Sequence, residues 1–396
     1  MKNHIYVTLI LCCNIFGILS FEIVNQWNLL NFDLPYDVGP EISDIRLENT
    51  VFTGLEMSED RFFIATPRLR AGVPATLSTI SRNTPRGSSP ILRAYPDWSM
   101  HGVLRGDLNC SGLISVYRIK TDSCQRLWVL DSGVVTSIDD FRMVCPPKIV
   151  IFDIHTDQIV RTIVLPRQVA RTNSLLTNLI IDEEVQGACD SAFVYMSDTA
   201  SPGIVVYDAR SERSWRLFDP SFFPDPDFGN YNIEGETFTL MDGVVGLAHS
   251  PYLGILFYQP LATDRIFSIP TSAITKGPQA EFEQLPVSLV GRKSSQGLGI
   301  TVNVNDDTLY FSPMTETSVA SWNPVTNRQT VLAHDPKRLQ FLAEMRWKPD
   351  GSIWVLSTRF QKFFKRTISP SEVNLRLIRI PADGDHYSGG DNFIYY

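Results

Sequence analysis

Short apolar runs with the two-residue period of a β-strand recur along the whole chain, each bounded by turn residues. The clearest set is RFFIATPR from Arg61, RLWVLDSG from Arg126, AFVYMSD from Ala192, GILFYQP from Gly254, DTLYFSP from Asp307 and SIWVLSTR from Ser352. A strand of small or apolar residues precedes each run, a third strand follows it, and five of the six repeats carry a fourth. Six repeats of four short strands are typical of a β-propeller.

The sixth repeat lacks a fourth strand after LRLIRI at 375, whereas the segment Ile23–Phe32 near the N-terminus reads as a strand without a repeat. We expect this segment to pair as the outer strand of the last blade, because closure of the ring removes edges that would otherwise aggregate. The predicted fold is therefore an all-β, six-bladed β-propeller over residues 21–384, followed by a C-terminal tail at 385–396. Two stacked β-sandwich domains are the alternative, but no Gly/Ser/Pro-rich linker interrupts the middle of the chain.

Residues 1–20 have the features of a secretory signal peptide. Lys2 supplies a positive start, Ile5–Leu19 is mostly apolar, and Ser20 is a small residue at a suitable cleavage point. The apolar stretch is shorter than the ~20 residues that span a bilayer. A buried N-terminal helix is the alternative. The sequence thus predicts a secreted, extracellular protein.

Cleavage at that point leaves four cysteines, and an even number in an exported chain predicts two disulfides. Successive connections in a blade alternate between the two faces of the ring, which favours the pairs Cys110–Cys145 and Cys124–Cys189. Asn109 begins the only Asn-x-Ser/Thr sequon and is the candidate glycosylation site, with a cysteine at its middle position.

The amino-acid composition limits the classes of binding partner that the protein can have. The net charge is -8 with 20% charged residues and no basic run, which argues against nucleic-acid or anionic-membrane partners. The chain has no HExxH, GxSxG, P-loop or CxxC motif, and its histidines are scattered, so no cofactor and no metal are expected. The weaker alternative is a channel metal held by Glu56, Asn178 and Asp198.

Several separated segments resemble one known family. The strings CQRLWVLDSG, CPPKIVIFD, DSAFVYMSD with GIVVYD, and FLAEMRW with GSIWVLSTR are similar in order and spacing to the Yellow / major royal jelly proteins of insects. The resemblance runs from about Trp27 to Ile380 and implies an extracellular six-bladed propeller. It also implies several functions, since members convert dopachrome in melanin synthesis, act in cuticle pigmentation, bind biogenic amines or serve as nutritive proteins.

We therefore expect a role in melanin or catecholamine biology, with dopachrome tautomerisation as the candidate enzymatic activity. Non-catalytic binding of a biogenic amine or another small aromatic ligand is the alternative. A structural or nutritive protein is the third reading, which a channel filled by side chains would favour. Fold alone does not decide among them.

The default ligand site of a propeller is the mouth of its central channel. Candidate positions near the starts of the inner strands are Thr53, Ser115, Asn178, Gln296, Ala343 and Glu344. The resemblance implies that amine-binding relatives use a Thr, an Asn and a Phe in the last blade. The matching positions here are Ala343, Thr358 and Phe360, and a hydroxyl cannot replace both the donor and the acceptor of an amide. Amine binding of that type is therefore disfavoured.

The long connection 219–242 should rise over the same mouth and roof it with aromatic side chains, namely Phe222, Phe223, Phe228, Tyr231 and Phe238. Tautomerisation needs a general acid/base and a donor to the developing oxyanion. Glu344, His101 and His249 have suitable side chains, but a lone histidine or carboxylate is more often structural, so no catalytic residue is assigned. Asp131 and Asp198 end equivalent strands, which favours a turn-building role for both.

Overall fold

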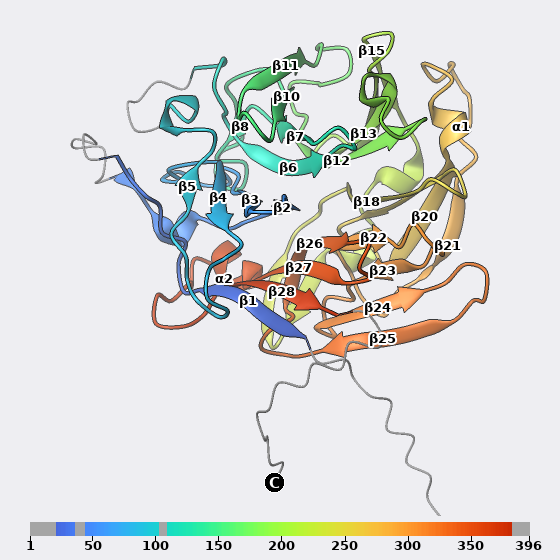
Figure 1. Cartoon of the computed structure of the whole chain (residues 1–396). Coiled ribbons are helices and arrows are strands. Elements are labelled where there is room, and N and C mark those ends of the chain that lie inside the picture. The colour runs from blue at the N-terminus through green and yellow to red at the C-terminus, as the bar shows by residue number, and fades with distance from the viewer. Residues whose placement is uncertain (1–20, 36–43, 103–108, 382–396) are drawn as a thin grey trace, which may run out of the picture.

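The computed structural model describes residues 21–35, 44–102 and 109–381. The predicted signal peptide at 1–20 and the predicted tail at 385–396 lie outside these ranges. Within them, the strands form six four-stranded antiparallel sheets and two short hairpins. The six sheets surround a central channel (Figure 1), which confirms the predicted six-bladed β-propeller.

Each blade contributes one strand to the channel wall, one to its outer edge and two between them. The inner strands are β2 (Gly54–Met57), β6 (Val116–Thr121), β12 (Leu176–Glu183), β18 (Val244–Ser250), β22 (Ile300–Val302) and β26 (Phe341–Trp347). The second strands are β3 (Arg61–Ala65), β7 (Arg126–Asp131), β13 (Ala192–Asp198), β19 (Ile255–Pro260), β23 (Leu309–Phe311) and β27 (Ile353–Thr358). The third strands are β4 (Leu77–Ser81), β10 (Lys148–Asp153), β14 (Gly203–Asp208), β20 (Arg265–Pro270), β24 (Ser318–Trp322) and β28 (Leu375–Ile380).

The outer strand of the last blade comes from the other end of the chain. Five blades end in β5 (Arg93–Ala94), β11 (Ile159–Val164), β15 (Arg213–Leu217), β21 (Ser288–Arg292) and β25 (Gln329–His334). In the sixth, β1 (Glu22–Trp27) pairs antiparallel with β28, placing Trp27 opposite Leu375. The buried Trp27 indole packs edge-on against Phe52 at 6.1 Å between ring centroids, joining the last blade to the first. The predicted closure is confirmed, although β1 ends five residues before Phe32.

Burial between neighbouring blades explains the near-continuous apolar runs. Every residue of β7 from Leu127 to Asp131 is buried, because both faces of that strand are covered by packed side chains. On the outer edge the same blade shows Ile159 and Val164 exposed. Strong hydrophobic runs therefore belong to the interior of each blade, whereas outer strands are more polar and harder to recognise.

The two disulfides are Cys110–Cys145 and Cys124–Cys189, in the predicted pairing. The repeated aspartates build turns, as predicted, because Asp131 accepts from the Gly133 N–H and Asp198 from the Ser201 N–H, both at 3.0 Å. Each also holds the start of the preceding inner strand. Asp131 accepts backbone hydrogen bonds from Ile114 at 2.9 Å and Ser115 at 2.8 Å. Asp198 accepts the corresponding bond from Leu175 at 2.9 Å.

Three further elements rise over one mouth of the channel and had no counterpart in the repeat pattern. The hairpin of β16 (Asn230–Ile233) and β17 (Glu236–Thr239) belongs to the long connection before β18. Helix α2 (Phe360–Phe364) follows β27 directly, and the hairpin β8 (Val134–Val135)–β9 (Arg142–Met143) follows β7. A short helix, α1 (Thr271–Ile274), lies after β20. None of the helices in the described ranges is both long and apolar enough to cross a membrane.

Candidate functional site

A cavity of about 240 Å³ lies at the channel mouth on the side of α2 and the β16–β17 hairpin. Its apolar walls include Phe52, Leu69, Leu261, Leu298, Phe341 and Phe360. Its polar groups include Thr53, Tyr117, Ser137, Thr177, Thr358 and Asp242. A largely apolar cavity with a few convergent polar groups is the usual form of a small-molecule site. The inner strands of different blades thus provide a site of the size of a small aromatic ring system.

Four of the predicted site residues line this cavity: Thr53, Ala343, Thr358 and Phe360. The other four do not, and of these the Ser115 hydroxyl accepts a hydrogen bond from the Arg68 backbone N–H at 2.9 Å. The Asn178 side-chain amide donates to the Val245 carbonyl at 2.8 Å, joining two neighbouring inner strands. Gln296 donates to the carbonyls of Phe228 and Asn230, both at 2.8 Å, and so fixes the base of the hairpin.

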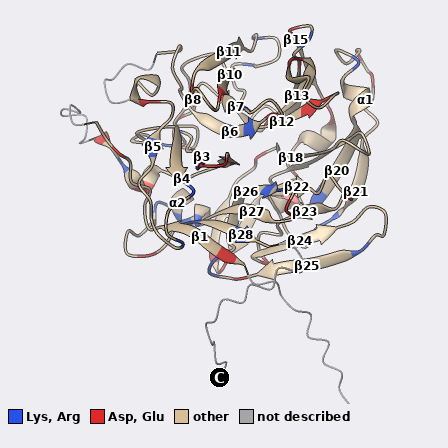
Figure 2. Ribbon diagram, viewed as in Figure 1, with Lys and Arg blue, Asp and Glu red and all other residues tan. Residues whose placement is uncertain are grey.

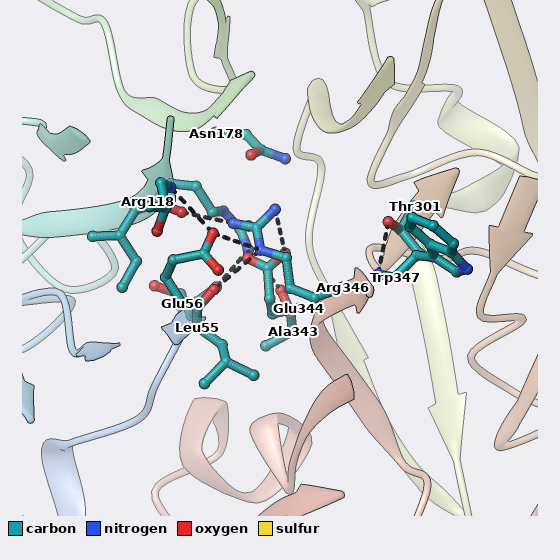
Figure 3. A network of polar contacts seen from close by, with 12 residues as sticks. Leu55, Glu56, Arg118, Asn178, Thr301, Ala343, Glu344, Arg346 and Trp347 are labelled. Carbon is teal, nitrogen blue, oxygen red and sulfur yellow. Dashed lines mark hydrogen bonds and ion pairs between the residues drawn. The ribbon is translucent and has the colours of Figure 1, made fainter. Parts of the chain in front are cut away.

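Glu344 lies beneath the cavity, in a layer of charged side chains that fills the channel (Figure 3). Its carboxylate pairs with the Arg118 guanidinium, which also donates to the Thr53 carbonyl at 2.6 Å. A second guanidinium, that of Arg346, lies 3.3 Å from Glu344 and donates to the Ile119 carbonyl at 2.7 Å. The cavity at the mouth is therefore bounded below by this layer of paired charges.

The predicted aromatic roof is only partly correct. Phe238 stacks on Tyr231 with ring centroids 4.7 Å apart and contacts Phe364 at 5.3 Å, so the hairpin supports α2 from behind. Phe360 in turn stacks on Phe341 at 4.5 Å. None of the five aromatic side chains predicted for the roof lines the cavity itself, and the three phenylalanines that precede the hairpin form no aromatic contact with α2 among the described residues.

Phe222 is buried between blades against Tyr258, 5.2 Å between centroids, and Phe223 is exposed. Phe222 ends the 3-10 turn Pro220–Phe222, and Phe223 is the C-terminal cap of that turn. The chain still follows the edge of blade three at this point. Phe228 ends a second such turn, Pro226–Phe228. Its backbone carbonyl accepts the Gln296 hydrogen bond, and its side chain does not line the cavity.

Asp242 is the acidic group of the cavity wall that sequence reasoning missed. Its side chain lines the cavity and makes no hydrogen bond or ion pair with any residue of the described chain. Burial among apolar groups raises the pKa of this carboxyl to about 7. A group whose pKa lies near neutrality can both accept and donate a proton at physiological pH.

The backbone next to Asp242 packs tightly against the chain of blade three and the turn that follows it. Gly243 donates to the Thr199 carbonyl at 3.1 Å, and a Cβ at position 243 would lie 2.9 Å from the Phe222 carbonyl oxygen. The chain must therefore pass close to blade three just after Asp242. This contact fixes the carboxyl in the cavity wall rather than on a mobile loop.

Two tyrosines flank the Asp242 carboxyl. The Tyr117 hydroxyl lines the cavity and shares a 2.8 Å hydrogen bond with Ser137. The buried Tyr231 hydroxyl has no hydrogen-bond partner. Burial raises the pKa of both phenols, and the nearby Asp242 charge raises them further. Both phenols therefore stay protonated, and Tyr117, the one of the two that lines the cavity, can donate a hydrogen bond to an oxygen there.

The histidines and the alternative metal set have structural roles. His101 is buried away from the cavity, where its ring contacts the Tyr95 carbonyl at 3.0 Å, and burial beside Arg68 lowers its pKa to about 3. His249 lies 3.6 Å from Asp182. Of the three residues in the alternative metal set, Glu56 pairs with Lys348 at 2.8 Å. Asn178 donates to the Val245 carbonyl, and Asp198 accepts from the Leu175 N–H. These three side chains therefore do not form one cation site.

Comparisons with known proteins agree with this architecture. The model of the family described as "Major royal jelly protein" matches residues 114–386. The chain belongs to the major royal jelly protein family. Among its relatives, dopaminechrome tautomerase of Drosophila melanogaster is 29% identical over 91% of this chain and 81% of its own length. Protein yellow of Drosophila erecta is 30% identical over 90% of this chain and 68% of its own.

Among solved structures, virginiamycin B lyase from Staphylococcus aureus matches with a TM-score of 0.45 and 11% identity, covering 79% of both chains. The family match was foreseen from the strand motifs of blades two, three and six. Asp242 could not be singled out in the same way, because it resembles Asp225 and Asp227 of the same connection until the ring is closed.

Proposed function

We propose that this family member is a secreted tautomerase of melanin-pathway aminochromes, acting in pigmentation, with its active site in the channel-mouth cavity. The observation that carries the proposal is the unpartnered Asp242 carboxyl, whose pKa of about 7 suits proton transfer. The 29% identity to dopaminechrome tautomerase supports the reaction class. The two disulfides support export, because such bonds persist in oxidising compartments.

The reaction needs only proton movements. When dopaminechrome becomes 5,6-dihydroxyindole, each methylene carbon of its five-membered ring loses one proton and each quinone oxygen gains one. Ionised Asp242 accepts a proton from carbon, and its protonated form returns one to oxygen. The hydrogen-bonded pair of Tyr117 and Ser137 hydroxyls keeps one free proton, which would donate a hydrogen bond to the developing oxyanion. No oxidant is required, since the electron count of the ring system does not change.

The charge of the cavity favours a substrate without a carboxylate. Asp242 is the acidic group of its wall, and the cation in that wall, Arg118, is engaged by Glu344 and by backbone carbonyls. A dopachrome carboxylate would therefore meet Asp242 without a free cation nearby. Dopaminechrome, which lacks that carboxylate, is the better fit.

The experiment follows the visible absorbance of dopaminechrome and of dopachrome with purified protein and with boiled protein. We expect the native protein to accelerate the decay of dopaminechrome, with a smaller effect on dopachrome. Equal decay rates of dopaminechrome with native and boiled protein would contradict the enzymatic proposal.

A second candidate function is amine binding without turnover, which the combination of an anionic carboxyl with Phe52, Phe341 and Phe360 also favours. Aromatic faces contribute about 0.5–2 kcal/mol to the binding of a cation. Ala343 and Thr358 reduce the polar contacts available to the ligand, and Thr358 donates only to the Phe341 carbonyl, at 3.4 Å.

The double substitution Ala343→Thr with Thr358→Asn therefore tests this second function. It introduces two hydrogen-bonding side chains into the cavity wall, each contributing about 0.5–1.5 kcal/mol to binding. We expect the affinity for dopamine or serotonin to rise about tenfold in titration calorimetry. Thr358→Val is the matched control, since it removes the hydroxyl and should not raise affinity. Unchanged affinity in the double variant would count against amine binding at this wall.

A further inference from the structure

The channel beneath the cavity holds more positive than negative charge. Figure 2 shows basic segments of β6 and β26 around the channel. Two carboxylates, those of Glu56 and Glu344, are buried there within the described chain. The cations that interact with them are Arg118, Lys120, Arg346 and Lys348. Four cations thus share two carboxylates in a region of low dielectric.

Three of these cations have an acidic partner, and Lys120 has none. Arg118 pairs with Glu344, Arg346 lies 3.3 Å from Glu344, and Lys348 lies 2.8 Å from Glu56. No hydrogen bond or ion pair engages Lys120 in the part of the chain that the structure describes.

Asp182, a carboxylate on the neighbouring inner strand β12, is already engaged. It accepts a hydrogen bond from the Tyr195 hydroxyl and lies 3.6 Å from His249. Lys120 therefore forms no ion pair with any carboxylate of the described chain, although the Glu56 charge acts on it from a longer distance.

The geometry of β6 places this lysine below the charged layer. Arg118 and Lys120 are two residues apart in a regular stretch of β6, so their side chains share one face of the strand, about 6.6 Å apart along it. Arg118 lines the cavity, whereas Lys120 does not and is only partly buried. Its accessible surface therefore lies on the side of Arg118 away from the cavity.

An unused hydrogen-bond donor accompanies the unpaired charge. On the same face of β6 as Lys120, the Arg118 Nε is buried without a hydrogen-bond partner. Burial, together with repulsion from Arg346, Lys348 and Arg118, lowers the pKa of Lys120 well below its usual value, although Glu56 opposes this effect. An unsatisfied buried donor destabilises a fold, and a negatively charged acceptor beside Lys120 would accept a hydrogen bond and favour the charged form of the lysine.

We propose that the channel binds a small inorganic anion, of the chloride or phosphate type, beside Lys120 on the side of Arg118 away from the cavity. The anion would supply the negative charge that Glu56 and Glu344 do not provide. The site is separate from the cavity that holds Asp242, and the proposal does not depend on the aminochrome reaction.

The test is thermal unfolding at constant ionic strength and pH 7, with gluconate replaced stepwise by chloride or, in a second series, by phosphate. A ligand that binds only the folded state raises the unfolding midpoint. We expect a saturable rise of about 2 °C or more for the native chain in at least one series. Chloride and phosphate are distinguished by which series saturates at the lower concentration.

Three variants separate specific binding from general salt effects. Lys120→Met should fold, because it removes an unpaired cation, and it should show no saturable rise. Lys120→Arg keeps the charge and should retain the response. Lys276→Met, at an exposed lysine paired with Glu283, is the matched control and should respond like the native chain. A native chain that does not respond to either anion, or a Lys120→Met variant with the full response, would overturn the proposal.

Discussion

Replacement of Asp242 by Asn should lower kcat/KM for dopaminechrome by about 10²–10⁴-fold, the usual contribution of a positioned acid/base group. The amide keeps the size of the side chain but cannot exchange a proton with the substrate. Asp227→Asn is the matched control, because this carboxyl lies in the same connection, is exposed and does not line the cavity. It should retain native activity. Full activity of Asp242→Asn would remove this residue from the mechanism.

The same carboxyl sets the expected pH dependence. Since the base form is required to remove a proton from carbon, log kcat/KM should rise with pH below about 7 and level off above it, following the Asp242 pKa of about 7. The ordinary value for this side chain is 3.8, so without the effect of burial the rise would be complete before pH 5.

Replacement of Glu344 by Gln should destabilise the fold by about 3 kcal/mol or more, as expected when one partner of a buried ion pair is removed. The variant leaves Arg118 and Arg346 in a channel that already holds excess positive charge. Urea denaturation measures the difference in free energy of unfolding.

Glu212→Gln is the matched control for this substitution. Its side chain is 69% exposed and pairs with Arg161 at 2.5 Å, so its loss should cost no more than about 1 kcal/mol. Equal stability of the two variants would show that the charged layer does not support the channel.

The blades could be predicted because their signals are local and repeated. Runs such as RLWVLDSG carry strand periodicity, burial and the turn-building Asp131 within a few residues. The closing strand and both disulfides then follow from the geometry of the ring.

The site was less accessible to sequence reasoning because it depends on contacts between distant segments. Arg118 and Glu344 are separated by 226 positions, and nothing near either residue indicates the pairing. Asn178 and Gln296 have suitable side chains and lie near the mouth, but backbone carbonyls occupy their amides. Asp242 stands out only once the ring is closed, since its pKa results from the apolar walls that several blades provide.

The most direct test of the account is the titration of the Asp242 carboxyl, followed by ¹³C NMR of aspartate-labelled protein, with Asp242→Asn used to assign the resonance. The account predicts a midpoint near pH 7 in the free protein and a changed midpoint when 5,6-dihydroxyindole is added. A midpoint near the ordinary value of 3.8, or a titration that the added ligand does not affect, would contradict it.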